Sequence, residues 1–491
     1  MTRYRTTIYT AVLLLALGAG GCAAPRMASE EHRLPLPGRY DTHSGAEDTT
    51  SVAALSWEEF FPDTLLQGHI RAAIEGNHSL ARTLERVRTA RSRVRTARAG
   101  LWPQLSAGVS AGVQRFGEYT MDGVGNSTTN TPELAREKHI PNPYRDFTLG
   151  AAFSWEADIW GRLTQRKRAA AARYMASAEA AYYARTLLVA EVAAQYFELV
   201  GLDRRKQLLE EVIREAEESW RLTSELMHEG EVTRLAVDQF GAYLLNLRGD
   251  LLATEQAIGE QERALCLLTG SLPGPVARIS FDGMRRLQFR SEAGIPAQLI
   301  ALRPDIRAAE AELMAALADA KAAHRAFFPQ LRLGAGGGFS AFDAGRWFTA
   351  PASLAYDLAA GLTAPLFNGR EIRTLWEEAQ GAQRAALASY HETVLRAYAE
   401  VTDRLAARDN LTLRGNLKQE ERRTLFRAVD DARELFQHNF IGYLEVLSAD
   451  QLYLECEMEY IRLSTERCIN EVQLYRALGG GAAESDITAE L

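Results

Sequence analysis

Cysteine, histidine and long apolar runs are all scarce in this chain, and each scarcity excludes a class of protein. The 491 residues include four cysteines, of which Cys266, Cys456 and Cys468 lie far from the N-terminus. Because these three form no CxxC pair, the sequence predicts neither a disulfide framework nor a zinc site, and it favours buried, inert thiols. The nine histidines belong to no HExxH motif, and neither a P-loop nor a nucleophile elbow occurs. We therefore expect no catalytic residue, no metal site and no cofactor.

Hydropathy and charge exclude two further classes. Beyond the N-terminus no run of 18 apolar residues occurs, since the best candidate, residues 187–200, is interrupted by Glu191 and Glu198. No transmembrane helix is predicted, and any membrane crossing would have to use a closed barrel. A formal charge of −8 argues against a nucleic-acid partner. The seven arginines between residues 82 and 98 are interpreted as the solvated face of a helix, with contact to lipid phosphates as the alternative.

The first 22 residues have the pattern of a signal peptide. Two arginines precede a short apolar stretch at residues 8–17, and small residues at 19–21 lead to Cys22. This ending resembles a bacterial lipoprotein signal, in which the cysteine is acylated and becomes the new N-terminus. Ala19 stands where that pattern prefers leucine, so ordinary cleavage nearby, with Cys22 incidental, is the alternative. The preferred interpretation is lipidation, for example with palmitate, at Cys22.

The two halves of the chain repeat each other. The tripeptide Pro-Gln-Leu begins at residues 103 and 329, an offset of 226, and later pairs are offset by 209 to 212. The recurring segments of the later part are Glu191-Val192 and Glu400-Val401, Glu225-Leu226 and Glu434-Leu435, Asp238-Gln239 and Asp450-Gln451, and Leu268-Thr269-Gly270 and Leu478-Gly479-Gly480. The nearly constant offset of the later pairs indicates a tandem duplication, and the first pair differs because the intervening segments of the two halves differ in length. The predicted organisation is a signal peptide (1–22), an N-terminal extension (23–56), two repeats (57–272 and 273–480) and a tail (481–491).

Each repeat is predicted to contain a long helical hairpin. No proline occurs between Pro143 and Pro273 or after Pro365, and both stretches are rich in strong helix formers. Apolar residues of the second stretch recur at steps of three and four, the helical period. Helices over 161–230 and 369–442 would each be about 100 Å long, and each would turn at a glycine-containing segment and return as a second helix.

Four stretches between the helices are predicted to be strands. They lie at residues 105–116, 147–155, 331–340 and 354–363, where apolar residues alternate with small or polar ones. About ten residues with one apolar face are typical of lipid-facing barrel strands, although a soluble sheet packed on helices is the alternative. Four strands cannot close a membrane barrel, and open edges are not tolerated in lipid. Sharing between chains would solve this problem, because three copies supply twelve strands.

From about Trp57 to Gly481 the ordered set of motifs resembles the TolC-type outer-membrane efflux factors, specifically the lipoprotein (NodT/OprM-like) branch of resistance-nodulation-division (RND) efflux systems. The matching segments are Trp102-Pro103-Gln104-Leu105 and its repeat, the stretch from Phe153 to Arg162, the stretch from Leu302 to Glu310, Pro365-Leu366-Phe367-Asn368-Gly369-Arg370, and Gly442-Tyr443-Leu444-Glu445-Val446-Leu447. The resemblance implies a mainly α fold with a transmembrane β-barrel contribution. Duplicated long hairpins would form a trimeric α-barrel, four strands per chain would form a shared twelve-stranded barrel, and residues 51–66, 272–296 and the C-terminus would form an equatorial region.

The same resemblance implies a passive function and a set of partners. The chain would be the outer-membrane exit channel of a tripartite efflux pump, not an enzyme, lipid-anchored and projecting into the periplasm. Its partners would be two further copies of itself, a periplasmic adaptor (membrane fusion) protein, an inner-membrane RND transporter and outer-membrane lipid. A duct for type I protein secretion is the alternative within the family. A structural coiled-coil scaffold would explain the helices but not the alternating strands.

The resemblance also places a periplasmic aperture at the two hairpin ends. Leu444 and Ser448 fall where the family has its narrowest apolar and polar rings, with Ser448 standing where an Asp is usual. Glu445, one helical step away, is expected to supply a cation-attracting ring of carboxylates. Arg234 and Asp238 belong to the other hairpin end, and Asp238 is expected to pair with basic side chains that hold the end closed. The alternative for Glu445 is an ordinary surface residue that points sideways.

Overall fold

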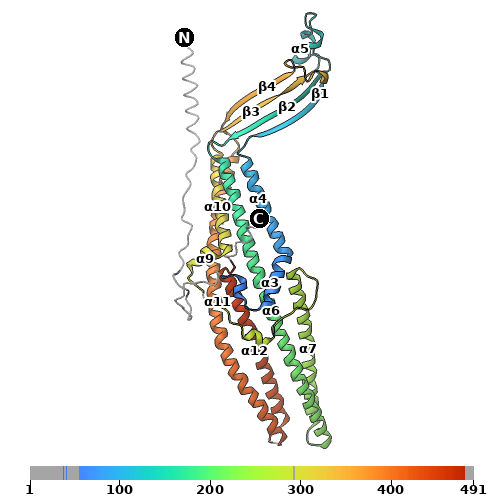
Figure 1. The fold of residues 1–491 in the computed structure, drawn as a ribbon, viewed down its shortest axis with the longest axis vertical. Helices are drawn as coiled ribbons and strands as arrows, with labels where there is room; N and C mark the ends of the chain where they lie inside the picture. Colours follow the sequence, from blue (N-terminus) through green and yellow to red (C-terminus); the bar gives the residue numbers. More distant parts are fainter. Residues whose placement is uncertain (1–36, 38–39, 41–54, 291–292, 439, 482–491) are drawn as a thin grey trace. The chain divides into compact units, whose positions relative to one another are not determined.

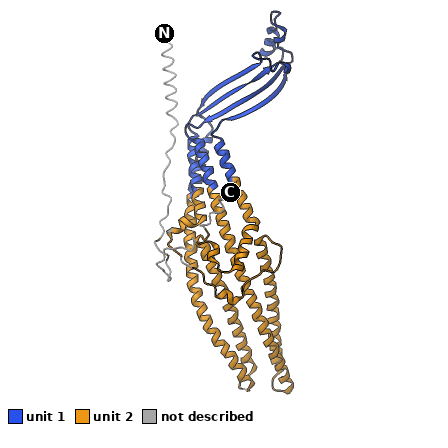
Figure 2. Cartoon of the chain, in the orientation of Figure 1, with its two compact units in different colours: residues 1–31, 90–174, 313–386 blue, residues 32–89, 175–312, 387–491 orange. Residues whose placement is uncertain are grey.

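The structure is a computed structural model that describes residues 37, 40 and 55–481, with the exception of 291–292 and 439. Cys22, the predicted lipidation site, lies outside the described residues, as do the predicted signal peptide and residues 482–491 of the tail. The chain divides into two compact units (Figure 2). One contains residues 90–174 and 313–386, and the other contains the described residues of 32–89, 175–312 and 387–491.

The first unit contains a four-stranded antiparallel sheet (Figure 1). Its strands are β1 (Gln104–Gln114), β2 (Tyr144–Ala157), β3 (Gln330–Ala341) and β4 (Leu354–Thr363), and they lie in that order. Gly108 pairs with Gly150, and Ala151 pairs with Gly337, so the glycine-rich parts of neighbouring strands lie side by side. All four predicted strands are confirmed, with lengths of 11, 14, 12 and 10 residues from β1 to β4.

The outer strands of this sheet present apolar side chains to their surroundings. Leu105, Val109 and Val113 are spaced by four residues, so they share one face of β1, and all three are exposed in the single chain. Tyr356 and Leu358 of β4 are also exposed. Since β1 and β4 each pair with one neighbour, the sheet has two edges at which further strands can add.

Two shorter helices with residues in both units, α4 (His78–Ala99) and α10 (Pro304–Arg325), and three short elements between the strands accompany the sheet. The short elements are α5 (Met121–Thr129), η2 (Arg136–Lys138) and η3 (Ala344–Arg346). All seven arginines between residues 82 and 98 are exposed on α4. This placement agrees with the interpretation of that basic stretch as a solvated helix face.

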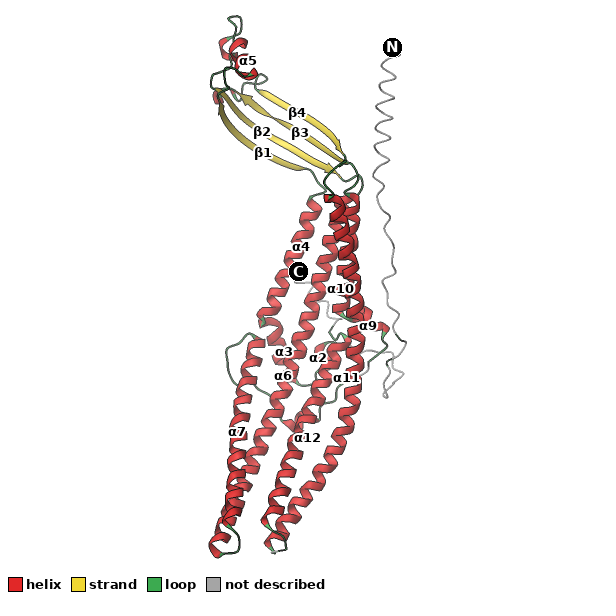
Figure 3. Ribbon diagram, turned by 180° about the vertical axis from the view of Figure 1, so that it is seen from behind, coloured by secondary structure: helices red, strands yellow, loops and turns green. Residues whose placement is uncertain are grey.

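Two long helical hairpins dominate the chain, as predicted (Figure 3). The first consists of α6 (Arg162–Glu229) and α7 (Arg234–Thr269), and the second of α11 (Glu371–Gln437) and α12 (Tyr443–Leu478). The helices α7 and α12 have equal lengths of 36 residues, and each ends at a glycine in the left-handed conformation, Gly270 at φ 70° and Gly479 at φ 89°. This shared C-cap gives a physical reason for the recurring Leu-Thr-Gly and Leu-Gly-Gly segments.

The core of the second unit lies where short helices meet the long ones. These short helices are α2 (Trp57–Phe60), α3 (Thr64–Gly76), α8 (Phe281–Arg285) and α9 (Ala297–Leu302). The Phe60 ring stacks on Tyr475 of α12 at a centroid distance of 4.2 Å. The buried Tyr196 hydroxyl donates to Asp63 Oδ2 at 2.5 Å and accepts from the Ile279 amide at 3.0 Å. The described parts of the predicted equatorial segments therefore pack together.

A buried arginine joins three parts of the second unit. Arg303 has a side chain only 4% exposed, and its guanidinium donates to both oxygens of Asp305, at 3.0 and 2.7 Å. It also donates to Glu400 Oε2 at 2.9 Å and to the Ala477 carbonyl at 2.5 Å. The segment from Leu302 to Glu310 thus has a structural role, because Arg303 connects α10, α11 and the end of α12.

Two further observations concern the helices and the thiols. Among the described residues, no helix combines the length and the apolar character that crossing a membrane requires. Cys266, Cys456 and Cys468 are free and buried, which confirms the burial predicted for them. Burial raises the pKa of the Cys456 and Cys468 thiols to about 11.

Candidate functional site

The ends of the two hairpins lie side by side in the second unit (Figures 1 and 3). The Phe240 ring of α7 approaches the Tyr443 ring of α12 at a centroid distance of 6.4 Å. Behind this contact, a small apolar cluster packs α6 against α7 through buried residues that include Leu209, Leu244 and Leu247. The two turns are therefore anchored by apolar packing, while their tips carry the polar residues.

The start of α12 holds three of the predicted aperture residues. Leu444, Glu445 and Ser448 are exposed, whereas Val446 and Leu447 between them are buried. The helical period explains this pattern, because positions three and four apart share a face. The three predicted residues therefore occupy the outward face of α12, and Leu444 is 53% exposed.

Glu445 also has a local role at this helix end. Gly442 is the N-cap of α12 and has no side chain to accept from the first amides. The carboxylate of Glu445, in the first turn, lies over Gly442, where Oε2 would be 3.1 Å from a Cβ at that position. A negative charge in the first turn stabilises a helix through the helix dipole. The single chain therefore shows Glu445 at the tip, exposed and turned toward the N-terminus of its own helix.

Arg234 and Asp238 lie in the first two turns of α7 and are brought near each other. Arg234 Nε is 3.8 Å from Asp238 Oδ2, and the two side chains are 86% and 67% exposed. An exposed ion pair four residues apart on a helix contributes little to stability. Asp238 thus has a basic neighbour. Because Arg234 belongs to the same helix, this pair does not join α7 to another helix.

A basic residue that the sequence did not single out makes the connection between helices. Arg433 of α11 donates through Nη2 to Glu215 of α6 at 2.6 Å and to Asp450 of α12 at 3.0 Å. The Asp450 side chain is 13% exposed, while the Glu215 side chain is 53% exposed. Burial raises the pKa of Asp450, and Arg433 acts in the opposite direction. One guanidinium therefore holds three helices together close to the hairpin ends.

The duplication contained a signal for this cluster. Asp238 and Asp450 occupy equivalent positions in the predicted repeats, and each is followed by glutamine. Within the single chain, Asp238 lies near the basic Arg234 of its own helix, whereas Asp450 pairs with Arg433 of α11. Sequence similarity alone could not distinguish the two copies, because burial and the position of Arg433 decide which carboxylate is paired.

Two polar atoms beside this cluster have no hydrogen-bond partner within the described residues. They are the Tyr243 hydroxyl and Gln239 Oε1, both on α7 and both buried. Burial raises the pKa of Tyr243, so the phenol is neutral at physiological pH and is able to donate. Leaving a buried polar atom without a partner costs free energy of folding. These two atoms therefore give this part of the hairpin end hydrogen-bonding capacity that the single chain does not use.

Comparisons with known proteins agree with this architecture. The family model described as "Outer membrane efflux protein" matches residues 69–271 and 295–480. Outer membrane protein OprJ of Pseudomonas aeruginosa is 32% identical over 488 residues, covering 96% of this chain and 95% of that protein. The cation efflux system protein CusC of Escherichia coli (strain K12) is 29% identical over 476 residues, covering 95% of this chain and 98% of that protein. A crystal structure of CusC superposes with a TM-score of 0.78 at 27% identity, over 94% of this chain and 100% of that chain. Because the family model and the full-length relatives cover most of the sequence, this chain belongs to the outer membrane efflux protein family and is the outer-membrane channel of an efflux system.

Proposed function

We propose that three copies of this chain form a continuous passive duct, with twelve strands in the outer membrane and long helices in the periplasm. The observation that carries this proposal is the four-stranded sheet with two free edges and an exposed apolar face. Such edges are tolerated in lipid only when they are paired, and pairing β1 of one copy with β4 of the next would remove them. The division into two repeats, 57–272 and 273–480, gives each copy two hairpins and two pairs of strands.

The duct is proposed to conduct small molecules and to catalyse no reaction. The energy for transport would come from an inner-membrane RND transporter, which a periplasmic adaptor would connect to the hairpin ends. Acylation of Cys22 would add a lipid anchor to the barrel, and it rests on the signal-peptide pattern alone. In this scheme the inner-membrane transporter selects the cargo. The name of CusC says that the cargo of that system is a cation, and for this chain the transporter would decide whether it is one.

The hairpin ends are proposed to form the aperture. Three copies of Glu445 would place three carboxylates around one opening, with Leu444 as an apolar constriction and Ser448 beside it. Like charges in a narrow aqueous mouth attract cations and repel anions. Asp238 and Arg234 would contribute charges at the neighbouring turns, and Arg433 would hold the ends closed through Asp450 and Glu215.

The test is planar-bilayer recording of Glu445→Gln. Glutamine keeps the size of the side chain and a polar oxygen that can lie over Gly442, while the charge is lost. We expect a lower cation preference, with the change largest at low salt because screening weakens charge effects.

Glu420→Gln is the matched control, since Glu420 is an exposed carboxylate far from the turn on α11. If both variants keep the conductance and selectivity of the parent channel, Glu445 does not line the aperture, and its role is confined to the end of α12.

A further inference from the structure

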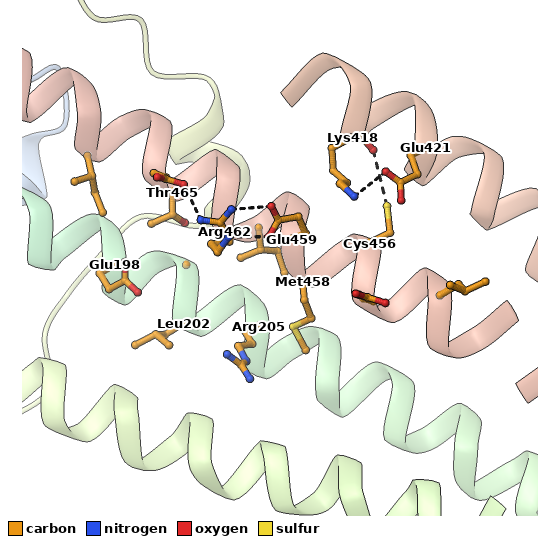
Figure 4. A pocket seen from close by; sticks show the side chains of 16 residues that line it. Glu198, Leu202, Arg205, Lys418, Glu421, Cys456, Met458, Glu459, Arg462 and Thr465 are labelled. Atoms are coloured by element: carbon orange, nitrogen blue, oxygen red, sulfur yellow. Dashed lines mark hydrogen bonds and ion pairs between the residues drawn. The ribbon is translucent and has the colours of Figure 1, made fainter. Parts of the chain in front are cut away.

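A pocket of about 700 Å³ lies on the second unit (Figure 4), and its lining residues do not include those of the two hairpin turns. It is bounded by α6, α11 and α12, and its apolar wall includes Leu202, Leu452, Met458 and Ile461. Pockets of this size hold small organic molecules, whose apolar parts such a wall would cover.

The charged groups around this pocket are unequal in number. Five carboxylates and three basic side chains line it, which leaves an excess of two negative charges. Lys418 pairs with Glu421 at 2.7 Å, and Arg462 pairs with both Glu459 and Glu466, at 2.7 and 2.8 Å. The basic groups on α11 and α12 are therefore occupied by carboxylates of the same wall. The third basic group, Arg205 of α6, is exposed and takes no part in these pairs.

Two carboxylates remain without such a pairing. Within the part of the chain that the structure describes, Glu198 of α6 and Glu455 of α12 form no ion pair. Much of the Glu198 side chain is exposed, yet the surrounding protein partly desolvates its carboxyl and raises its pKa. A positive charge bound nearby would offset that penalty.

The floor of the pocket contains an unused hydrogen-bonding group. Thr465 is 5% exposed, and its hydroxyl has no hydrogen-bond partner among the described residues. It lies against Gly201 of α6, where an added Cβ would be only 2.5 Å from Thr465 Oγ1. Both residues line the pocket, so a bound ligand with a polar group would supply the missing partner.

We propose that this pocket binds an organic cation with apolar substituents, held by Glu198 and Glu455, with its body against the apolar wall and Thr465 at the floor. A bare metal ion fits less well, because no group of three or more His, Cys, Asp or Glu side chains in the described residues is arranged to hold one. Met458 and the buried Cys456 offer polarisable apolar contact instead. The site lies outside the proposed aperture, so its occupancy is measurable independently of channel conductance.

The experiment uses tetraphenylphosphonium and tetraphenylborate, which have nearly the same size and shape but opposite charge. Binding of each to the full-length protein in detergent is measured by equilibrium dialysis, with protein-free micelles as the blank. We expect one saturable phosphonium site per chain, and binding of the borate at least about tenfold weaker. Equal binding of the two ions above the blank, or no saturable phosphonium binding, would overturn the proposal.

Two isosteric variants then locate the site. Glu198→Gln removes one charge, and we expect the affinity for phosphonium to fall about tenfold. Thr465→Val removes the hydroxyl, and we expect the affinity for phosphonium to fall about threefold. Glu218 is an exposed carboxylate on α6 outside the pocket, so the Glu218→Gln variant should bind phosphonium as the parent protein does. If Glu198→Gln and Glu218→Gln bind phosphonium equally, the ion sits elsewhere and the assignment of this pocket is wrong. Circular dichroism of each variant checks that the helices are intact.

Discussion

Replacing Arg303 with methionine removes the guanidinium that joins α10, α11 and the end of α12 while keeping much of the side-chain volume. Two carboxylates and one carbonyl lose a donor, since Arg303 contacts Asp305, Glu400 and the Ala477 carbonyl. Removing one partner of a buried ion pair costs roughly 3–5 kcal/mol, because the other charge is left without compensation.

The structure places the expected cost at the lower end of that range. The Asp305 and Glu400 side chains are 17% and 21% exposed, so water reaches both in part. Glu400 also keeps a second contact, with Arg476. We therefore expect Arg303→Met to lower the free energy of unfolding by about 3 kcal/mol.

Arg396→Met is the matched control. Arg396 pairs with Glu392 one turn earlier on α11, and the two side chains are 75% and 67% exposed. Exposed helix pairs of this kind contribute about 0.3–0.5 kcal/mol, so this variant should unfold almost as the parent does.

The assay is urea denaturation of the purified protein in detergent, followed by the helical circular dichroism signal. The midpoint should fall clearly for Arg303→Met and hardly at all for Arg396→Met. If the two midpoints coincide, the buried cluster around Arg303 does not stabilise the helical unit, and its role in this fold has been misjudged.

Three further outcomes are expected. Native mass spectrometry of detergent-purified protein should give a trimer, and a stable membrane-inserted monomer would contradict the shared barrel. Palmitate labelling should occur in the parent and disappear in Cys22→Ser, whereas equal labelling of the two, or none in either, would exclude lipidation at Cys22. Burial raises the pKa of the Cys456 and Cys468 thiols to about 11, so few of them are thiolates at pH 8. Iodoacetamide at pH 8 should therefore alkylate them at least about a hundredfold more slowly in the native protein than in urea, as followed by mass spectrometry of their peptides. Comparable rates would show that these thiols are accessible.

The long elements of this protein were predictable because their signals are local. The helices α6 and α11 begin and end within a few residues of the predicted glycines, since proline-free stretches with apolar residues at helical spacing have few alternatives. Strand β4 matches its predicted bounds, 354–363, because strict alternation fixes which side chains share a face. The ordered motifs across both repeats were also sufficient to indicate the family.

The pairing of charges depended on the tertiary structure. Asp238 and Asp450 are equivalent in sequence, yet Asp450 alone is largely buried and pairs with Arg433, because packing of α11 against α12 brings the two together. Arg303 and Glu400 are far apart in the chain, and their contact follows from the way the helices pack. Periodicity and composition report on a residue's own helix or strand, whereas partners across helices are determined by distance and burial, and these exist only once the chain has folded.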